Sequence, residues 1–226
     1  MQTPSLIIFA NFRIDNEERY LRMQDSLASF KDICAYRWVI NIRGEFKEQA
    51  SIFLKTHLGA KLVCSQLESK LGWFHDTRSL LKEIDSEFVL FWLEDHINLS
   101  KVEEYENILV EMKKNNCDQL TYTWWYPEFK DVFTPIKSSD STCLEYFDIT
   151  PCSIKKIEKL QGRYVIPLSI PGIFNVAFFK NIIRSNHPRL KRWPKVTPFD
   201  FEKRSTDKEF MNFKHESNEE INTSLI

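Results

Sequence analysis

The fold is decided by the stretch Ser86-Glu87-Phe88-Val89-Leu90-Phe91-Trp92-Leu93-Glu94-Asp95-His96. Its apolar run, Phe88–Leu93, leads directly into two carboxylates and an imidazole. A short strand that is apolar on both faces is typical of the centre of a parallel sheet with helices on each side. Ligands of open α/β sheets bind beyond the carboxyl ends of the strands, so the three polar residues are expected at a ligand site. The alternative is that they only begin a loop and cap the next helix.

Length and composition describe an ordinary globular protein. The chain has 226 residues, 42% of them hydrophobic and 28% charged, which is enough to bury a substantial core. With 31 basic and 32 acidic residues the net charge is −1, so nothing in the overall charge indicates a nucleic-acid partner. The 5 glycines argue against a glycine-rich phosphate loop.

The cysteines favour a cytoplasmic protein. They number five and none forms a C-x-x-C pair, so reduced thiols are expected. The residues before the apolar run Leu6–Ala10 include no basic segment, which argues against a signal peptide. No apolar run reaches the ~20 residues that a membrane helix needs, so any membrane contact is expected to be peripheral.

Apolar strands and amphipathic helices alternate along the first half of the chain. Strands that alternate with helices of about ten to fifteen residues are typical of an α/β sandwich. The sequence therefore predicts a three-layer α/β sandwich with a mostly parallel central sheet. The expected strands are Leu6–Ala10, Tyr36–Ile42, Ala60–Cys64, Phe88–Leu93 and Gln119–Trp125, and the expected helices are Glu17–Phe30 (capped by Asp15 or Asn16), Glu45–His57, His75–Ile84 and Lys101–Asn115.

The pattern is looser after Trp125. We expect strands at Tyr164–Ile166 and Ile173–Phe179, a short helix over Lys180–Ser185 and a last helix over Asp200–Phe213. No internal repeat and no second core is evident. The prediction is a single domain over residues 1–226, made of two halves, 1–125 and 126–215, and a polar tail, 216–226.

Several motifs follow one another in a recognisable order. An apolar strand leads to Asn11-Phe12-Arg13, the second strand contains Asn41, and Gly72, Asp76-Thr77-Arg78 and Glu94-Asp95-His96 come later. Over about residues 5–125 this order resembles a family 2 glycosyltransferase of the GT-A type, which has a Rossmann-like fold. The resemblance implies a nucleotide-diphosphate sugar bound through a divalent metal, Mn²⁺ or Mg²⁺. It also implies sugar transfer to a hydroxyl of a saccharide or lipid-linked saccharide, in bacterial surface polysaccharide synthesis.

The resemblance also implies roles for individual residues. It places metal ligands at Asp95 and His96, with His215 as a late addition, and donor contacts at Asn11, Arg13, Asn41, Arg43, Arg78 and Glu94. Carboxylates suit these hard cations, and Mn²⁺ also accepts imidazole. In an extended segment, Glu94 and His96 would point the same way. Residues 1–125 would then bind the nucleotide sugar, and residues 126–215 the acceptor.

The chain departs from the family pattern in two places. The family's second strand usually ends in an aspartate that binds the nucleoside, whereas this chain has Asn41 and then Arg43-Gly44. The metal motif is Glu-Asp-His instead of Asp-x-Asp. Ordinary structural roles also stay open: a turn for Asn11 and Arg13, and a solvated helix face for Arg78.

Two later segments carry further expectations. In the resembled family, an acidic pair at the start of a late helix supplies the general base, and here Glu202 and Asp200 occupy that place. Both would equally serve as helix-capping residues. The basic stretch 184–195 is either a solvated loop or a peripheral contact with an anionic acceptor at the inner membrane face.

Two other functions remain open at this point. A sugar nucleotidyltransferase would share the sheet, but it usually has a glycine-rich loop with a lysine after the first strand, where this chain has Asn11-Phe12-Arg13. A degenerate, non-catalytic member that binds a sugar nucleotide or a partner would account for the altered metal motif.

Overall fold

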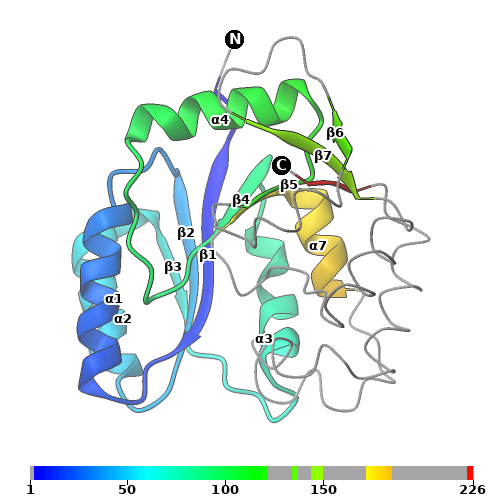
Figure 1. Cartoon of the computed structure of the whole chain (residues 1–226). Coiled ribbons are helices and arrows are strands. Elements are labelled where there is room, and N and C mark those ends of the chain that lie inside the picture. Colours follow the sequence, from blue (N-terminus) through cyan, green and yellow to red (C-terminus); the bar gives the residue numbers. More distant parts are fainter. Residues whose placement is uncertain (1–2, 122–133, 137–143, 150–171, 185–222, 226) are drawn as a thin grey trace.

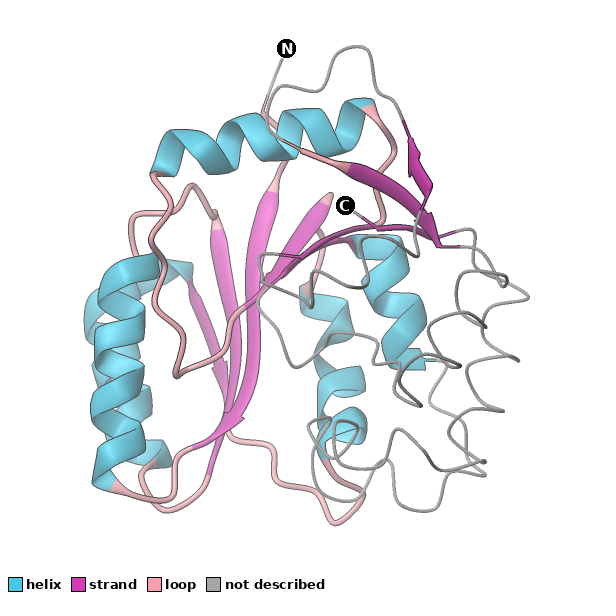
Figure 2. Cartoon of the chain, viewed as in Figure 1, coloured by secondary structure: helices cyan, strands magenta, loops and turns pink. Residues whose placement is uncertain are grey.

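The computed structural model describes residues 3–121, 134–136, 144–149, 172–184 and 223–225 (Figure 1). Within these ranges, helices lie on both faces of a mixed sheet (Figure 2). The strands are β1 (Leu6–Arg13), β2 (Arg37–Arg43), β3 (Leu62–Ser65), β4 (Phe88–Phe91), β5 (Gln119–Thr121), β6 (Thr134–Ile136), β7 (Tyr146–Ile149), β8 (Gly172–Asn175) and β9 (Thr223–Leu225). The α-helices are α1 (Glu17–Phe30), α2 (Lys47–Leu58), α3 (Trp73–Leu80), α4 (Val102–Lys114) and α7 (Val176–Arg184), and short 3₁₀ turns follow α2 (Gly59–Lys61) and α3 (Leu81–Glu83).

The sheet is mostly parallel and β4 lies inside it. The described strands run in the order β3-β2-β1-β4-β8-β5-β9-β7-β6. β3, β2, β1 and β4 are parallel to one another, and β8 is antiparallel to its neighbours β4 and β5. The predicted α/β fold class is therefore confirmed, and the strand predicted at Phe88–Leu93 is central as expected, although it ends at Phe91.

Side chains of β1 alternate between two apolar cores, as the twofold period of a strand requires. Ile8, Ala10 and Phe12 face the core that α1, α2 and α4 cover. Ile7 and Phe9 face the other core, which α3 and α7 cover. The sheet is thus buried on both sides, which explains why its central strands are continuous apolar runs.

The strand register brings the predicted site residues to one edge. β1 pairs with β2 so that Asn11 lies opposite Asn41 and Arg13 opposite Arg43. On its other side, β1 pairs with β4, and the Trp92 backbone N–H donates to the Phe9 carbonyl oxygen at 2.8 Å. The carboxyl ends of these three strands therefore lie side by side.

One predicted strand ends too late. Ile173–Phe179 was expected to be extended, but β8 ends at Asn175 and α7 begins at Val176. The Asn175 side-chain oxygen accepts hydrogen bonds from the backbone N–H groups of Ala177 (2.9 Å) and Phe178 (3.4 Å), as in a helix N-cap. From there, Phe179, Ile182 and Ile183 are buried at helical spacing.

Other expectations fall partly or wholly outside the described residues. These are the strand Tyr164–Ile166, the helix Asp200–Phe213 and the end of the strand that begins at Gln119. In the described part of the chain, no helix has the length and apolar character needed to cross a membrane.

Candidate functional site

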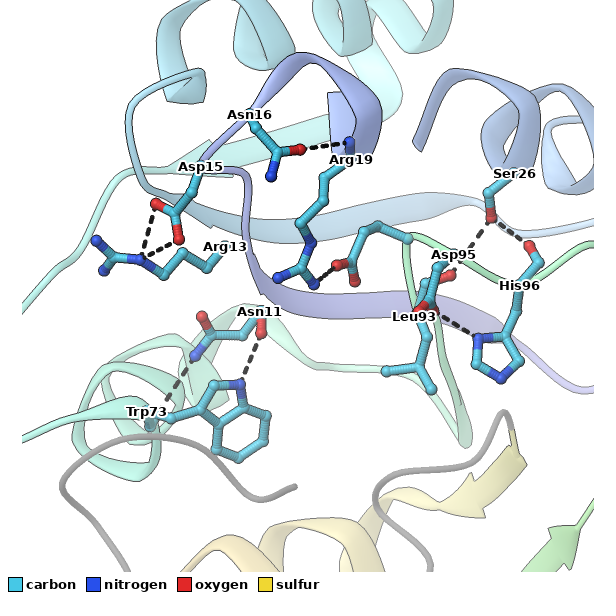
Figure 3. Close-up of polar contacts among 11 residues, drawn as sticks. Asn11, Arg13, Asp15, Asn16, Arg19, Ser26, Trp73, Leu93, Asp95 and His96 are labelled. Carbon is cyan, nitrogen blue, oxygen red and sulfur yellow. Dashed lines mark hydrogen bonds and ion pairs between the residues drawn. The ribbon is translucent and has the colours of Figure 1, made fainter. Parts of the chain in front are cut away.

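The acidic residues after β4 lie on a turn that α1 holds in place (Figure 3). The buried Ser26 hydroxyl, on α1, contacts the carbonyl oxygens of Leu93 (3.3 Å) and His96. The same hydroxyl accepts a 2.8 Å hydrogen bond from the Trp92 indole. Because Trp92 is itself fully buried, the backbone that carries Glu94 and Asp95 has a fixed position at the carboxyl edge.

Glu94 turns inward and pairs with Arg19. Its side chain is 4% exposed, and it accepts a hydrogen bond from the Arg19 guanidinium, whose side chain is 42% exposed. Burial raises the pKa of Glu94, and the nearby Arg19 charge opposes that rise. The expectation that Glu94 and His96 share a direction was wrong, because residues 94–95 form a turn and not an extended segment.

Asp95 and His96 face solvent and pair with each other. His96 Nδ1 lies 2.8 Å from Asp95 Oδ1, and both side chains are roughly half exposed. The hydrogen bond from the ring holds the pKa of Asp95 below its usual value, although partial burial opposes this. Asp95 is therefore an ionised, accessible carboxylate at the edge of the sheet.

Asn11 and Asn41 form a buried amide pair. Asn41 Nδ2 donates to Asn11 Oδ1 at 2.9 Å, and Asn11 Nδ2 donates to Thr77 Oγ1 (2.8 Å) and to the Trp73 carbonyl oxygen (3.2 Å). Asn41 also bonds both backbone polar groups of Leu67, donating to the oxygen at 2.9 Å and accepting from the N–H at 2.7 Å. These bonds fix α3 and the loop after β3 against the ends of β1 and β2. Each amide nitrogen donates both of its N–H groups within the protein, so donation to a ligand would require one of these bonds to break.

Arg13 and Arg43 lie in register but have different surroundings. Arg13 is nearly half exposed, donates to Asp15 (2.8 Å) and pairs with Glu68. Arg43 is 8% exposed, and its buried Nε has no hydrogen-bond partner in the part of the chain that the structure describes. Burial lowers the pKa of Arg43, and the neighbouring Asp76 carboxylate opposes this. Arg43 is therefore a buried cation at the same edge of the sheet as Asp95.

The close turn after β2 depends on Gly44. Its φ of +94° is in the region that favours glycine, and a Cβ atom there would lie 2.4 Å from the Ile14 carbonyl oxygen. The Ile14 N–H donates to the Arg43 oxygen at 2.9 Å, so the chain after β1 lies directly against the end of β2. This contact holds the backbone of Arg43 against the segment that follows β1.

Arg78 contacts the end of another helix. Its Nε donates to the Ile183 oxygen at 3.2 Å and one terminal nitrogen to the Arg184 oxygen at 3.5 Å. These are terminal carbonyl groups of α7, where a cation is favourable. The structure thus brings Asn11, Asn41, Arg43 and Asp95 to neighbouring strand ends and turns Arg78 toward α7.

The remaining predicted site residues lie outside the described ranges. These are Asp200, Glu202, His215 and the basic stretch apart from Arg184. Among the described residues no three His, Cys, Asp or Glu side chains are grouped so that they could hold a metal ion. Asp95 suits a hard cation as an accessible carboxylate, whereas Glu94 is committed to Arg19.

A cavity of about 350 Å³ lies at the opposite end of β4. Its lining includes Glu87, Phe88, Lys113 and Cys117, at the amino end of the strand. Ligands of open α/β sheets bind at the carboxyl ends, so this cavity is separate from the candidate site.

Comparisons with known proteins support the fold. No family model matches the sequence, and a search of curated proteins found no match. S. aureus TarS 1–349 is similar in structure, with a TM-score of 0.52 at 15% identity over 98% of this chain and 58% of that chain. TarS 1–349 in complex with UDP gives a TM-score of 0.51 at 15% identity over 98% and 57%. The chain thus spans somewhat over half the length of these proteins, and the likeness concerns the fold alone, a GT-A-like α/β sandwich.

Sequence reasoning missed the residues that support the site. Arg19, Ser26, Glu68 and Asp76 each contact or neighbour a predicted site residue. One signal was present in the sequence, because helices that follow parallel strands begin at the carboxyl edge. The first turns of α1 and α3 therefore had to lie near the ends of β1 and β3, the strands that they follow.

Proposed function

We propose that the chain is a glycosyltransferase that binds a nucleotide-diphosphate sugar at the carboxyl edge of β2, β1 and β4. The observation that carries the proposal is the accessible, ionised Asp95 on a fixed turn at that edge. The GT-A-type fold supports it, because ligands of such sheets bind at these strand ends.

In the proposed reaction, the acceptor hydroxyl oxygen attacks the anomeric carbon while the bond from that carbon to the diphosphate oxygen breaks. The acceptor proton passes to Glu202 or Asp200. Asp95, with His96 beside it, would hold a divalent cation, and His215 would be the remaining protein ligand of that cation. A bound cation supplies charge neutralisation of the diphosphate leaving group.

The described residues have two further parts in this proposal. Asn11 and Asn41 keep the strand ends and the loop after β3 in position, since their amide groups are already bonded within the protein. Arg13 contributes positive charge at the mouth of the site, although two carboxylates already balance it.

The test is nucleotide-dependent thermal stabilisation with and without Mn²⁺. Nucleotide sugars should raise the melting temperature of the wild-type protein more strongly when Mn²⁺ is present. In Asp95→Asn, Mn²⁺ should no longer increase the rise in melting temperature that nucleotide sugars cause. The variant should also lose sugar transfer. Asp25→Asn, at an exposed position on α1, is the matched control and should behave as wild type. An undiminished Mn²⁺-dependent shift in Asp95→Asn would falsify the role of Asp95.

A further inference from the structure

Arg43 is a buried cation whose Nε has no hydrogen-bond partner among the described residues. The residue is 8% exposed, and this Nε is buried with no acceptor in the described part of the chain. None of the described residues forms a hydrogen bond or an ion pair with its guanidinium. Burying a charged donor without an acceptor costs free energy, so such groups are rare unless something else uses them. A ligand that accepts hydrogen bonds from Arg43 would offset that cost.

The surroundings of Arg43 are already in place for a ligand. Residues 41 and 43 face the same side of β2, and Asn41 bonds both backbone groups of Leu67 in the loop after β3. The same loop pairs with Arg13 through Glu68. Two independent contacts thus fix the loop whose Glu68 carboxylate influences Arg43.

The local charge favours a neutral ligand over a phosphate. The charged groups that influence Arg43 are one cation, Arg13, and three carboxylates, those of Asp76, Glu68 and Asp15. Counting Arg43 itself, the carboxylates exceed the cations by one. A phosphate would add negative charge to this group, whereas a carbonyl oxygen or ring nitrogen would satisfy the guanidinium without doing so.

The spacing of the strands also favours a base, and not a phosphate, next to Arg43. Arg43 ends β2 and Asp95 follows β4, with β1 between them. Neighbouring strands lie ~4.8 Å apart, so these two strand ends are separated by about 10 Å. The ribose and its 5′ linkage bridge such a gap between a base and a diphosphate. With the diphosphate near Asp95, the group near Arg43 is the base.

We propose that Arg43 recognises the nucleobase of the donor and selects a base that presents two adjacent acceptors, guanine or cytosine, over uracil and adenine. This inference rests on the proposed function. The guanidinium is a planar fork of parallel donors, which matches O6 and N7 of guanine or O2 and N3 of cytosine. Uracil places the N3 proton between its oxygens, and adenine places an amino group beside N7, so each offers the fork a donor where it needs an acceptor.

The experiment measures the affinities of GDP, CDP, UDP, ADP and inorganic pyrophosphate, each with Mn²⁺, by titration calorimetry. Wild type should bind GDP or CDP at least about tenfold more tightly than UDP and ADP. Arg43→Met should remove that preference, and Arg43→Lys, which keeps the charge but loses the fork, should remove it as well. Arg22→Met is the matched control. Arg22 is exposed and pairs with Glu18 on α1, so this variant should keep the preference for GDP or CDP.

A melting measurement without ligand separates recognition from a structural role. Because Arg43 forms no hydrogen bond with the described residues, Arg43→Met should lose only charge interactions, chiefly the one with Asp76, and should melt close to the wild-type temperature. A marked fall in the melting temperature of Arg43→Met would instead show that Arg43 supports the fold, and it would overturn the proposal.

The other outcomes are equally distinct. A preference for UDP or ADP in wild type, or a guanine or cytosine preference that survives in Arg43→Lys and Arg43→Met, overturns the inference but leaves the proposed function intact. Equal loss of pyrophosphate and GDP binding in Arg43→Met identifies a phosphate contact and also overturns it. If wild type binds none of the nucleotides, the proposed function itself fails.

Discussion

Asn11 and Asn41 lie opposite each other at the carboxyl ends of β1 and β2, and Asn41 Nδ2 donates a 2.9 Å hydrogen bond to Asn11 Oδ1. Both side chains are at most 3% exposed. Through Trp73, Thr77 and Leu67 the pair connects two strands, α3 and the loop after β3. An amide serves this purpose because it donates and accepts at once, which a carboxylate cannot do.

Asn41→Asp should therefore destabilise the protein strongly. A buried carboxylate at this position loses the two donated hydrogen bonds and faces two carbonyl oxygens, Oδ1 of Asn11 and the backbone oxygen of Leu67. We expect the free energy of unfolding to fall by about 2–4 kcal/mol. Denaturant unfolding at pH 7 measures this change in the free energy of unfolding. Gln49→Glu, a matched change at an exposed helix position, should shift it by less than about 0.5 kcal/mol. Equal effects of the two changes would contradict the assigned role of the amide pair.

The Arg19–Glu94 pair should show strong coupling. Arg19→Met leaves a buried carboxylate without its partner, and we expect a loss of about 1–3 kcal/mol, reduced from the fully buried case because Arg19 is two-fifths exposed. Glu94→Gln should cost less, since the remaining arginine reaches solvent. A double-mutant cycle by denaturant unfolding measures the coupling. Additive effects of the two substitutions would show that the pair contributes nothing to stability.

The elements of the first half could be predicted from sequence because each has a local signal. α1 spans Glu17–Phe30 as predicted, since Asn16 caps it and Met23, Leu27 and Phe30 form its buried face. The start of α7 was missed because Ile173–Phe179 is apolar throughout, and only the Asn175 cap separates strand from helix. Local patterns therefore predict elements well where caps and periodicity agree.

The site could be predicted in position but not in its bonding. A polar residue after an apolar strand must lie at the carboxyl edge, which gave the neighbourhood of Asn11, Asn41 and Asp95. The partner of Glu94 lies 75 residues earlier in the chain, so its inward orientation has no local signal. The burial of Arg43 likewise has no local signal, because the Ile14 backbone that bonds to it belongs to a segment much earlier in the chain.

Cys117 should resist modification in the folded protein. It is 1% exposed, and burial raises its pKa to about 12, with Asp118 and Glu111 adding to the rise. Compared with the usual value of 9.0, the thiolate fraction at pH 8 is about a thousandfold lower. Iodoacetamide labelling followed by peptide mass spectrometry should find Cys117 far slower than the half-buried Cys34, and the difference should vanish in denaturant. Equal rates in the folded protein would contradict the burial of this thiol.

Gly44 and Gly59 form a natural pair for testing the turn that carries Arg43. Both have positive φ, +94° and +55°, but a Cβ at Gly44 would lie 2.4 Å from the Ile14 oxygen, whereas one at Gly59 would meet nothing within 4 Å. Gly44→Ala must relieve both a backbone clash and an unfavourable φ, so we expect a loss of about 2–4 kcal/mol. Gly59→Ala adds only the backbone cost of φ +55° with ψ −130°, about 1–3 kcal/mol, so Gly44→Ala, which carries a clash as well, should be the more costly of the two. Since the clash pushes the Ile14–Asp15 segment away from the end of β2, Gly44→Ala should also weaken nucleotide binding, and Gly59→Ala should not. Comparable losses of stability and of binding in the two variants would show that the close approach at Gly44 is not what holds Arg43 in place.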